Sequence, residues 1–335
     1  MFLKSKLPNL QQNIFLANHT TFRIGGPAKY FLVAREQKEL VAAIRWAKEN
    51  NLLFYILGGG SNLLVNDKGY EGLIIKVQSD SSSVILRGEA AKDLKRDKIK
   101  ITVEAGVSFN KVIINTVKNN FSGVEWGFGI PGTIGGAIFG NAGRLGRDIS
   151  PVVKSVKTLD ENLNEKIIPA EECGFAYRES RFKKTGEIIL EAELEFAKKE
   201  KKAIEPIFSA AKEVFANSPK FPSAGCIFKN YIVGVADTLL IEHPELKDRV
   251  RGGRAERGLS PSQLGGKIGV GYLIDRCGLK GKKIGGAQIW ESHANYIVNL
   301  GNAKTKNVLA LISLVKNSVK EKYSVELEEE IRRMK

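Results

Sequence analysis

Glycine is concentrated in two short segments of this chain, and this distribution limits the folds that the chain can adopt. Residues 127–143 read GFGIPGTIGGAIFGNAG, and residues 57–64 read LGGGSNLL at the end of a short apolar run. Glycine permits positive φ angles and lets another group approach the backbone closely. Successive exposed backbone N–H groups in such loops bind anions. The two segments together predict a site for the two phosphates of one pyrophosphate, whereas either segment alone is also compatible with a tight turn.

The common nucleotide-binding motifs do not account for these loops. The sequence has no G-x-x-x-x-G-K-S/T, which argues against a P-loop ATPase. No G-x-G-x-x-G stands between a strand and a helix with an acidic residue about 20 positions later. A bound dinucleotide would therefore not be held in the Rossmann manner.

Hydrophobic periodicity predicts a mixed chain of helices and strands. Helices are expected over residues 38–50 and 205–216, after Ser108 as far as Gly123, and after Thr305 to about residue 322, with Ser108 and Thr305 as N-caps. Strands are expected over residues 52–57, 73–77, 99–104, 152–159, 187–196 and 324–332. Residues 78–98 are polar and predict a solvated hairpin excursion, and residues 231–270 have no clear assignment.

Charge and cysteine usage argue against several classes of protein. The three cysteines and three histidines are scattered, so we predict no disulfide framework and no metal site. A net charge of +15 allows nucleic-acid binding, but the basic runs are short and lack a recognition motif, which favours a surface that attracts phosphorylated small ligands. No apolar run reaches the roughly 20 residues of a membrane helix, and the N-terminus lacks a signal-peptide pattern, so we expect a cytoplasmic protein.

A series of segments, read in order, resembles the UDP-N-acetylenolpyruvoylglucosamine reductase family. TFRIGGPA at 21–28, LGGGSNLL at 57–64, GIPGTIGGA at 129–137 and NAG at 141–143 are similar to its FAD-binding segments. FAYRES at 175–180, SAGCIFKN at 223–230 and LEEEI at 327–331 are similar to its catalytic segments. LIDRCGLKG at 273–281 and HANYIVN at 293–299 extend the match over nearly the whole chain.

This resemblance implies a fold, a reaction and two cofactors. The implied fold class is α+β, a non-Rossmann fold that holds FAD non-covalently between two subdomains, plus a separate α+β substrate domain. The implied regions are 1–77 with 323–335, then 78–216, then 217–322 with an atypical insertion at about 231–270. The implied enzyme uses NADPH to reduce UDP-N-acetylglucosamine enolpyruvate in peptidoglycan precursor synthesis. The alternative is another FAD oxidoreductase of this fold that acts on a different sugar or alcohol.

The resemblance also assigns binding residues. Its FAD contacts fall on Arg23, Gly58, Gly59, Gly60, Ser61, Asn62, Leu63, Gly129, Ile130, Pro131, Gly132, Thr133, Gly135, Gly136, Ala137 and Asn141. Its substrate contacts fall on Tyr177, Lys229, Asn230, Lys280 and Asn295. The family normally continues the Lys-Asn pair with proline, whereas Tyr231 follows here. The long insertion after it is either a basic flap over the substrate diphosphate or a solvated loop without a role.

Two charged residues match catalytic positions of the family. Arg178 would grip the substrate carboxylate in a fork and stabilise the charge that develops on it. Without the motif, Arg178 would be interpreted as the ion-pair partner of a neighbouring glutamate such as Glu179. Glu330 would act with Arg178 on the carboxylate, and the alternation of its segment turns it away from apolar Leu327. Without the motif, Glu330 is one more acid of a glutamate-rich tail.

Cys226 is the third catalytic position, and it departs from the family. Most members have a serine there as the proton donor. A thiol, with an ordinary pKa of about 8.5, is a stronger acid than an alcohol and can do the same work. The alternative is a buried and inert cysteine that packs as a small hydrophobic residue.

Overall fold

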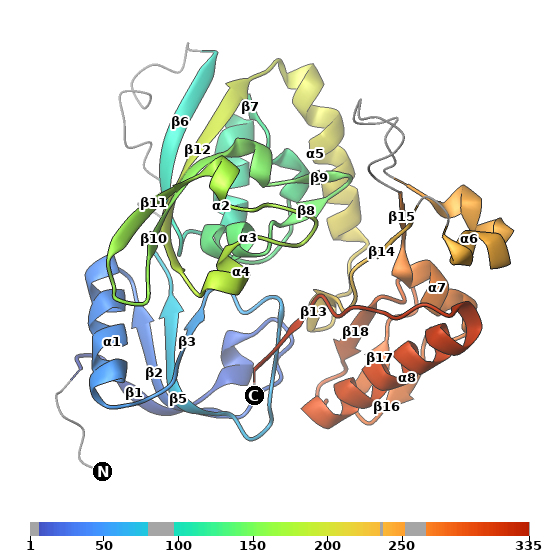
Figure 1. Cartoon of the computed structure of the whole chain (residues 1–335), viewed down its shortest axis with the longest axis horizontal. Helices are drawn as coiled ribbons and strands as arrows, with labels where there is room; N and C mark the ends of the chain where they lie inside the picture. The colour runs from blue at the N-terminus through green and yellow to red at the C-terminus, as the bar shows by residue number, and fades with distance from the viewer. Residues whose placement is uncertain (1–6, 80–96, 235–236, 252–265, 335) are drawn as a thin grey trace. The chain divides into compact units, whose positions relative to one another are not determined.

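The computed structural model in Figure 1 describes residues 7–79, 97–234, 237–251 and 266–334. Most of the predicted excursion at 78–98 and part of the predicted basic flap lie outside the described residues. The chain divides into two compact units whose segments alternate along the sequence. Unit 1 comprises Met1–Ile14, Ala28–Gly60 and Tyr70–Ser218, and unit 2 comprises Phe15–Pro27, Ser61–Gly69 and Pro219–Lys335.

A four-stranded sheet of order β1-β2-β5-β3 forms the first part of unit 1. Its strands are β1 (Gln11–Phe15), β2 (Pro27–Ala34), β3 (Phe54–Leu57) and β5 (Tyr70–Val77). Both β2 and β3 run parallel to β5, and α1 (Gln37–Glu49) connects them. Leu40, Ile44 and Ala47 recur at helical spacing on the buried face of α1 and share a core with Leu73 and Ile75 of β5.

An antiparallel sheet of order β11-β10-β12-β6 forms the second part of unit 1, with β7 also paired to β12. Its strands are β6 (Lys98–Glu104), β7 (Phe121–Ser122), β10 (Val153–Leu159), β11 (Glu165–Pro169) and β12 (Ile188–Lys198). The same unit contains α2 (Phe109–Lys118), α3 (Ile134–Phe139), α4 (Phe182–Thr185), α5 (Lys201–Ala216) and the ribbon of β8 (Gly143–Arg144) and β9 (Arg147–Asp148). In β12, buried Ala192, Leu194 and Phe196 alternate with glutamates, so one face of the strand enters the core.

Unit 2 contains an antiparallel sheet of order β13-β18-β17-β16. Its strands are β13 (Ser223–Cys226), β16 (Lys283–Ile284), β17 (Ala287–Ile289) and β18 (Tyr296–Asn299). The helix α8 (Thr305–Tyr323) packs on β16 and β17 and buries Val308, Leu311, Ile312 and Val315 (Figure 1). The unit also has α6 (Thr238–Glu242), α7 (Val270–Arg276), the pair β14 (Tyr231–Ile232) and β15 (Lys267–Ile268), and the parallel pair β4 (Leu63–Val65) and β19 (Arg332–Met334).

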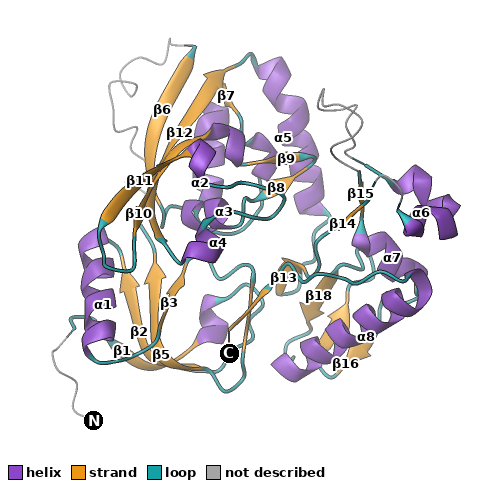
Figure 2. Ribbon diagram, viewed as in Figure 1, coloured by secondary structure: helices purple, strands orange, loops and turns teal. Residues whose placement is uncertain are grey.

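The helices and strands predicted from periodicity are confirmed except at the C-terminus, where the predicted strand over 324–332 is wrong. Val325, Leu327 and Ile331 are buried, as the alternation requires, but their segment is drawn as loop up to β19 (Figure 2). An isolated bridge pairs Glu329 with Phe228. Alternating side chains can fill a core without a continuous ladder, because burial of apolar groups does not depend on where the backbone hydrogen bonds go.

The predicted helix caps need correction as well. Ser108 precedes α2 as predicted, but its side chain makes no capping hydrogen bond, and α2 ends at Lys118, before Gly123. Thr305 is the first residue of α8, and Lys304 occupies the cap position. The Thr305 hydroxyl donates to the Val65 carbonyl at 2.7 Å. This side chain, predicted to cap the helix, therefore binds a backbone group that is distant in sequence.

The two compact units divide the chain at other places than the three regions implied by the resemblance. Those three regions stay a prediction. Of the helices in the described ranges, none has the length and apolar character needed to cross a membrane. Those same ranges hold no group of three or more histidine, cysteine, aspartate or glutamate side chains placed to bind a metal ion.

Candidate active site

The two glycine segments of unit 1 lie against each other, as the sequence predicts. The first follows β3 directly, and a Cβ placed on Gly58 would lie 2.8 Å from Thr133 Oγ1. A Cβ on Gly59 would lie 2.7 Å from the Cα of Gly132. Side chains at Gly58 and Gly59 would therefore collide with the second loop, and only glycine lets the two backbones come this close.

The start of α3, in the second glycine segment, corrects the prediction of successive exposed N–H groups. The Ile134 N–H donates to Val107 and the Gly135 N–H to Ala105, both at 2.9 Å. The Gly136 N–H donates to the Thr133 hydroxyl at 3.3 Å. The bonds from Ile134 and Gly135 hold the helix start on the segment that follows β6. A phosphate would have to bind N–H groups of the loops that precede α3 and follow β3.

Asn110 of α2 fixes the second glycine loop, and sequence analysis missed it. Its side-chain oxygen accepts the Gly129 N–H at 2.7 Å, and its nitrogen donates to the Ile130 carbonyl at 3.2 Å. Gly129 has a φ of +80°, and Phe215 occupies the place of a Cβ there. Nothing in the local sequence distinguishes Asn110 from other polar helix residues, because its partners lie 19 and 20 positions away.

A tight turn presents Tyr177 and Arg178. Ala176 and Glu179 exchange backbone hydrogen bonds of 3.1 and 3.0 Å across the turn, and Arg178 adopts a φ of +58°. That conformation is uncommon for a residue with a side chain and is often found at functional sites. The Arg178 guanidinium donates to the Gly143 carbonyl at 2.8 Å and lies 5.3 Å from the centre of the Tyr177 ring.

Asn141 connects this turn to α3. Its side-chain nitrogen donates to the Ala176 carbonyl at 2.8 Å. Asn141 is only 2% exposed, and its Oδ1 is buried without a hydrogen-bond partner among the described residues. The predicted positions Asn141, Tyr177 and Arg178 are thus brought together within unit 1.

The predicted FAD contacts of unit 2 lie on two supported segments. Arg23 has a φ of +53°, and the Asn299 side chain donates to its carbonyl at 3.3 Å. Asn62 precedes β4 and donates from its side chain to the Glu330 carbonyl at 3.0 Å. The Arg332 N–H donates in turn to the Asn62 carbonyl at 3.0 Å. Asn62, predicted to bind the cofactor, is therefore held by the C-terminal segment.

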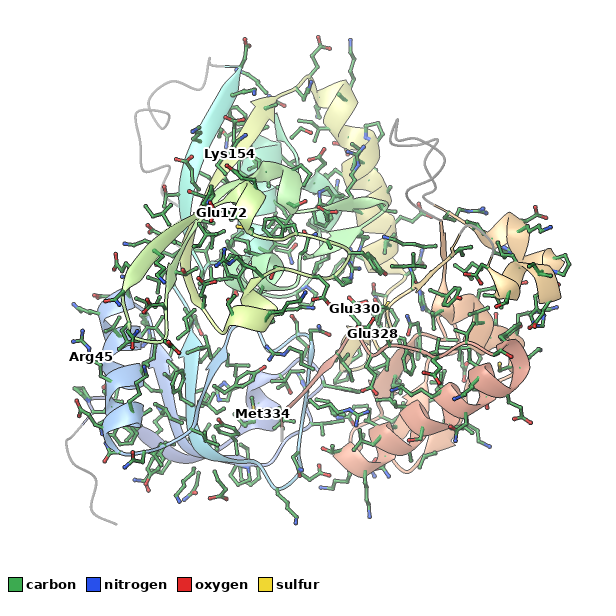
Figure 3. All side chains as sticks on the ribbon, viewed as in Figure 1. Arg45, Lys154, Glu172, Glu328, Glu330 and Met334 are labelled. Atoms are coloured by element: carbon green, nitrogen blue, oxygen red, sulfur yellow. The ribbon has the colours of Figure 1, made fainter. Side chains whose placement is uncertain are left out.

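Cys226 and Glu330 lie on neighbouring segments of unit 2. The Glu330 N–H donates to the carbonyl of Ile227, the residue after Cys226, at 2.8 Å. The Lys229 N–H donates to the Glu328 carbonyl at 2.9 Å, and Figure 3 labels Glu328 and Glu330 close together on the C-terminal segment. The Cys226 and Glu330 side chains are both partly exposed. The structure therefore brings the segment that follows the predicted proton donor against the segment that carries the predicted acid.

A bulge precedes Cys226. The register between β13 and β18 shifts between Ser223, opposite Val298, and Cys226, opposite Tyr296. Gly225 within it has a φ of +79° and open space where a Cβ would lie. Bulges of this kind redirect the side chain that follows and are common next to active sites.

Three predicted substrate residues of unit 2 have polar partners. Lys229 Nζ lies 2.6 Å from Glu328, and Lys280 Nζ lies 2.7 Å from Asp275. The Asn230 side chain accepts the Val270 N–H at 3.3 Å, which ties it to the first residue of α7. Both ammonium groups therefore have a carboxylate partner that an anionic ligand would have to replace or share.

Asn295, the remaining predicted substrate residue, is 2% exposed. Its Oδ1 accepts the Phe228 N–H at 3.0 Å, and its Nδ2 donates to the Phe228 carbonyl at 2.8 Å. Both polar atoms of its amide therefore bind the protein backbone, which does not match the predicted role of a substrate contact.

Comparison with known proteins identifies both parts of the chain. Residues 28–162 match the family described as FAD binding domain, and residues 217–334 match UDP-N-acetylenolpyruvoylglucosamine reductase, C-terminal domain. The UDP-N-acetylenolpyruvoylglucosamine reductase of Alkaliphilus oremlandii is 34% identical over 95% of this chain and 90% of its own. That of Caldanaerobacter subterraneus subsp. tengcongensis is 36% identical over 95% of this chain and 91% of its own.

A solved structure agrees with these matches. The crystal structure of UDP-N-acetylenolpyruvylglucosamine reductase from Thermus caldophilus superposes with a TM-score of 0.71 at 28% identity, covering 97% of this chain and 100% of that one. This confirms the predicted α+β, non-Rossmann FAD-binding fold. This chain is more than 30% identical to several reductases over almost its full length and theirs, and it therefore belongs to the UDP-N-acetylenolpyruvoylglucosamine reductase family.

Proposed function

We propose that this protein reduces UDP-N-acetylglucosamine enolpyruvate to UDP-N-acetylmuramate with NADPH and FAD, a step of peptidoglycan precursor synthesis. Family membership over the full length supports the reaction. The observation that carries it is the backbone pairing of residues 227–229 with residues 328–330, which brings the segment that follows Cys226 against the segment that carries Glu330. Reducing a carbon–carbon double bond needs a hydride and a proton, and Cys226 is the proposed proton donor.

The residues present fit FAD. The backbones at Gly58 and Gly59 lie against the second loop where a Cβ would collide, and Asn141 has a buried oxygen without a partner in the described chain. The residues proposed to hold FAD are Arg23, Gly58–Leu63, Gly129–Thr133, Gly135–Ala137 and Asn141. Bound FAD supplies the hydride chemistry, from NADPH to the terminal methylene carbon of the enolpyruvyl group.

Arg178 is the proposed group for the substrate carboxylate. Hydride addition at the methylene carbon places negative charge on the adjacent carbon and on the carboxylate. A guanidinium binds a carboxylate through two parallel N–H groups and stabilises such charge. The turn holds Arg178 at a φ of +58°, a conformation that costs about 1–3 kcal/mol and is often found at functional sites.

Cys226 and Glu330 are the proposed groups for the proton. The Cys226 thiol would donate its proton to the carbon adjacent to the carboxylate, and solvent would then reprotonate the thiolate. Glu330 would act with Arg178 in polarising the carboxylate, so that the double bond accepts the hydride more readily. The pairing of residues 227–229 with 328–330 keeps the two side chains on adjoining segments while this happens.

Lysine side chains of unit 2 are the proposed contacts of the UDP diphosphate. Lys229 and Lys280 each lie within 2.7 Å of a carboxylate, so the diphosphate would exchange with or join Glu328 and Asp275. Tyr177 and Asn230 are proposed as further contacts of the sugar nucleotide. Because NADPH and UDP-sugars are cytoplasmic metabolites, we also propose the cytoplasm as the location.

The decisive experiment follows NADPH absorbance under anaerobic conditions with FAD-loaded protein, with and without UDP-N-acetylglucosamine enolpyruvate. Sustained oxidation only in the presence of the sugar nucleotide is expected. Flavin that NADPH reduces but the sugar nucleotide does not reoxidise would point to a different substrate for the same fold. Protein that takes up no flavin would contradict the assignment of both glycine loops.

Variants of Cys226 test the proton donor in the same assay. Cys226→Ala is expected to slow reoxidation of the flavin by the sugar nucleotide by about 10²–10⁴-fold, as loss of a general acid does. Cys226→Ser is the matched control, because it keeps a donor of similar size and is expected to retain most of the activity. Equal losses in the two variants would contradict the role of a proton donor at this position.

A further inference from the structure

The Asn295 side chain pairs with a single residue as an opposing strand would. Its Oδ1 accepts the Phe228 N–H at 3.0 Å, and its Nδ2 donates to the Phe228 carbonyl at 2.8 Å. Its own carbonyl accepts the Ile227 N–H at 2.8 Å. An opposing residue of an antiparallel strand would bind the N–H and the C=O of Phe228 in the same way. The Asn295 amide therefore takes the place of one backbone residue in a β-ladder.

This replacement lies where the ladder between β13 and β18 stops. Cys226 is opposite Tyr296 in the register, and the backbone of β18 begins at Tyr296. Asn295 itself is fixed, since its N–H donates to His293 Nδ1 at 3.3 Å and the Tyr296 N–H donates to the His293 carbonyl at 3.0 Å. The amide therefore extends the support of β13 past Cys226 from a rigid turn.

The other edge of the same segment supports the acid. The Ile227 carbonyl accepts the Glu330 N–H at 2.8 Å, and the Lys229 N–H donates to the Glu328 carbonyl at 2.9 Å. Residues 227–229 thus lie between Asn295 on one edge and the C-terminal segment on the other. A shift of Phe228 would move Cys226 and the backbone of Glu330 together.

We propose that Asn295 is a positioning residue for the proton-delivery step. Its amide holds the segment that carries Cys226, and through the bond between Ile227 and Glu330 it also holds the acid, without contact to the substrate. The inference rests on the proposed function and names a residue on which that function depends. Misplacement of reacting groups by about 1 Å can cost on the order of 10²-fold in rate.

The proposed role of Asn295 concerns one of the two half-reactions. Reduction of the flavin by NADPH uses neither the Cys226 proton nor the Glu330 carboxylate, whereas its reoxidation by the sugar nucleotide uses both. Loss of the Asn295 amide is therefore expected to slow the second half alone. A residue that served only the stability of unit 2 would affect flavin content and both halves together.

The test compares Asn295→Leu, Asn295→Asp and a matched control in FAD-loaded, full-length protein. Leucine removes both side-chain hydrogen bonds, and aspartate keeps an acceptor for the Phe228 N–H. Thr305→Val is the control, because it removes another buried hydrogen bond of unit 2, to the Val65 carbonyl, that does not involve residues 226–230. For each variant, anaerobic stopped-flow measures both half-reactions, thermal unfolding measures stability, and iodoacetamide labelling with mass spectrometry measures the alkylation rate of Cys226.

Asn295→Leu is expected to lower the reoxidation rate by about tenfold or more and to change the alkylation rate of Cys226, with flavin reduction by NADPH changed by less than about twofold. Asn295→Asp is expected to lose less than Asn295→Leu, and Thr305→Val to change neither rate. Reoxidation at the wild-type rate in both Asn295 variants, or equal losses in both half-reactions, overturns the proposal. Failure of the wild-type protein to be reoxidised by the sugar nucleotide would instead overturn the proposed function.

Discussion

Replacing Gly59 with alanine tests whether the close approach of the two glycine loops determines cofactor binding. A Cβ at Gly59 would lie 2.7 Å from the Cα of Gly132, whereas ordinary van der Waals contact begins at 3.4 Å. The colliding atom belongs to the backbone, so rotation of a side chain cannot relieve the overlap. The two loops must separate by about 0.7 Å, or the backbone around them must deform.

The cost of this overlap can be estimated. Insertion of one carbon into well-packed structure typically costs about 1–3 kcal/mol. Because both loops are proposed to bind FAD, the displacement is expected to appear in FAD affinity. At about 1.4 kcal/mol for each tenfold change in an equilibrium constant, the dissociation constant would rise by about five- to 140-fold.

The assay is titration of flavin-free protein with FAD, followed by flavin fluorescence, together with the flavin content of protein as purified. Gly140→Ala is the matched control in the same unit. A Cβ at Gly140 would meet the Gly136 carbonyl at 3.5 Å, an ordinary contact, and Gly140 has an unstrained φ of −92°. Wild-type FAD affinity in Gly59→Ala, or an equal loss in Gly140→Ala, would refute the argument from close approach.

Two further predictions concern titratable groups. Burial raises the pKa of the Cys173 thiol to about 11. Iodoacetamide is therefore expected to modify partly exposed Cys226 in the native protein and Cys173 only after unfolding. Mass spectrometry of the labelled peptides measures both modifications. Burial alone would raise the pKa of the Glu329 carboxyl, but hydrogen bonds from Lys316 and Arg333 hold it below its usual value. The stability that this carboxylate contributes is therefore present above its unfolded-state pKa and lost as pH falls through its folded-state pKa. Glu329→Gln is expected to lower the free energy of unfolding, measured by denaturant titration, by about 1 kcal/mol at neutral pH. The difference in unfolding free energy between the variant and the wild type is expected to shrink below about pH 4.5. A difference that stays constant to low pH would count against this pairing.

Much of the secondary structure could be predicted from the sequence, because its signals are local. The buried face of α1 repeats at helical spacing, and β12 alternates between buried residues and glutamates. The two glycine segments were also informative, since the absence of side chains at Gly58 and Gly59 indicates a close neighbour even when that neighbour is unknown. The order of motifs along the whole chain indicates the family independently of the fold.

Other features were decided by partners far away in the chain. The segment 324–331 alternates like a strand and buries its apolar residues, yet its pairing with residues 227–229 is one isolated bridge and not a continuous ladder. Thr305 was expected to cap α8, but the Val65 carbonyl takes its hydroxyl. A single helix end or strand cannot reveal such competition, since the competing acceptor lies hundreds of positions away in the sequence.

In the candidate site, too, some features follow from the sequence and others from the tertiary structure. The sequence by itself determined which residue types are available, namely an arginine, a cysteine where serine is usual, and a glutamate in an acidic tail. Only the tertiary structure decided that Asn295 holds the backbone at Phe228, that Arg178 adopts a positive φ, and that the first N–H groups of α3 are already bound. The physical reason is that side-chain identity is encoded position by position, whereas each buried polar atom binds whichever partner the whole fold brings within hydrogen-bond distance.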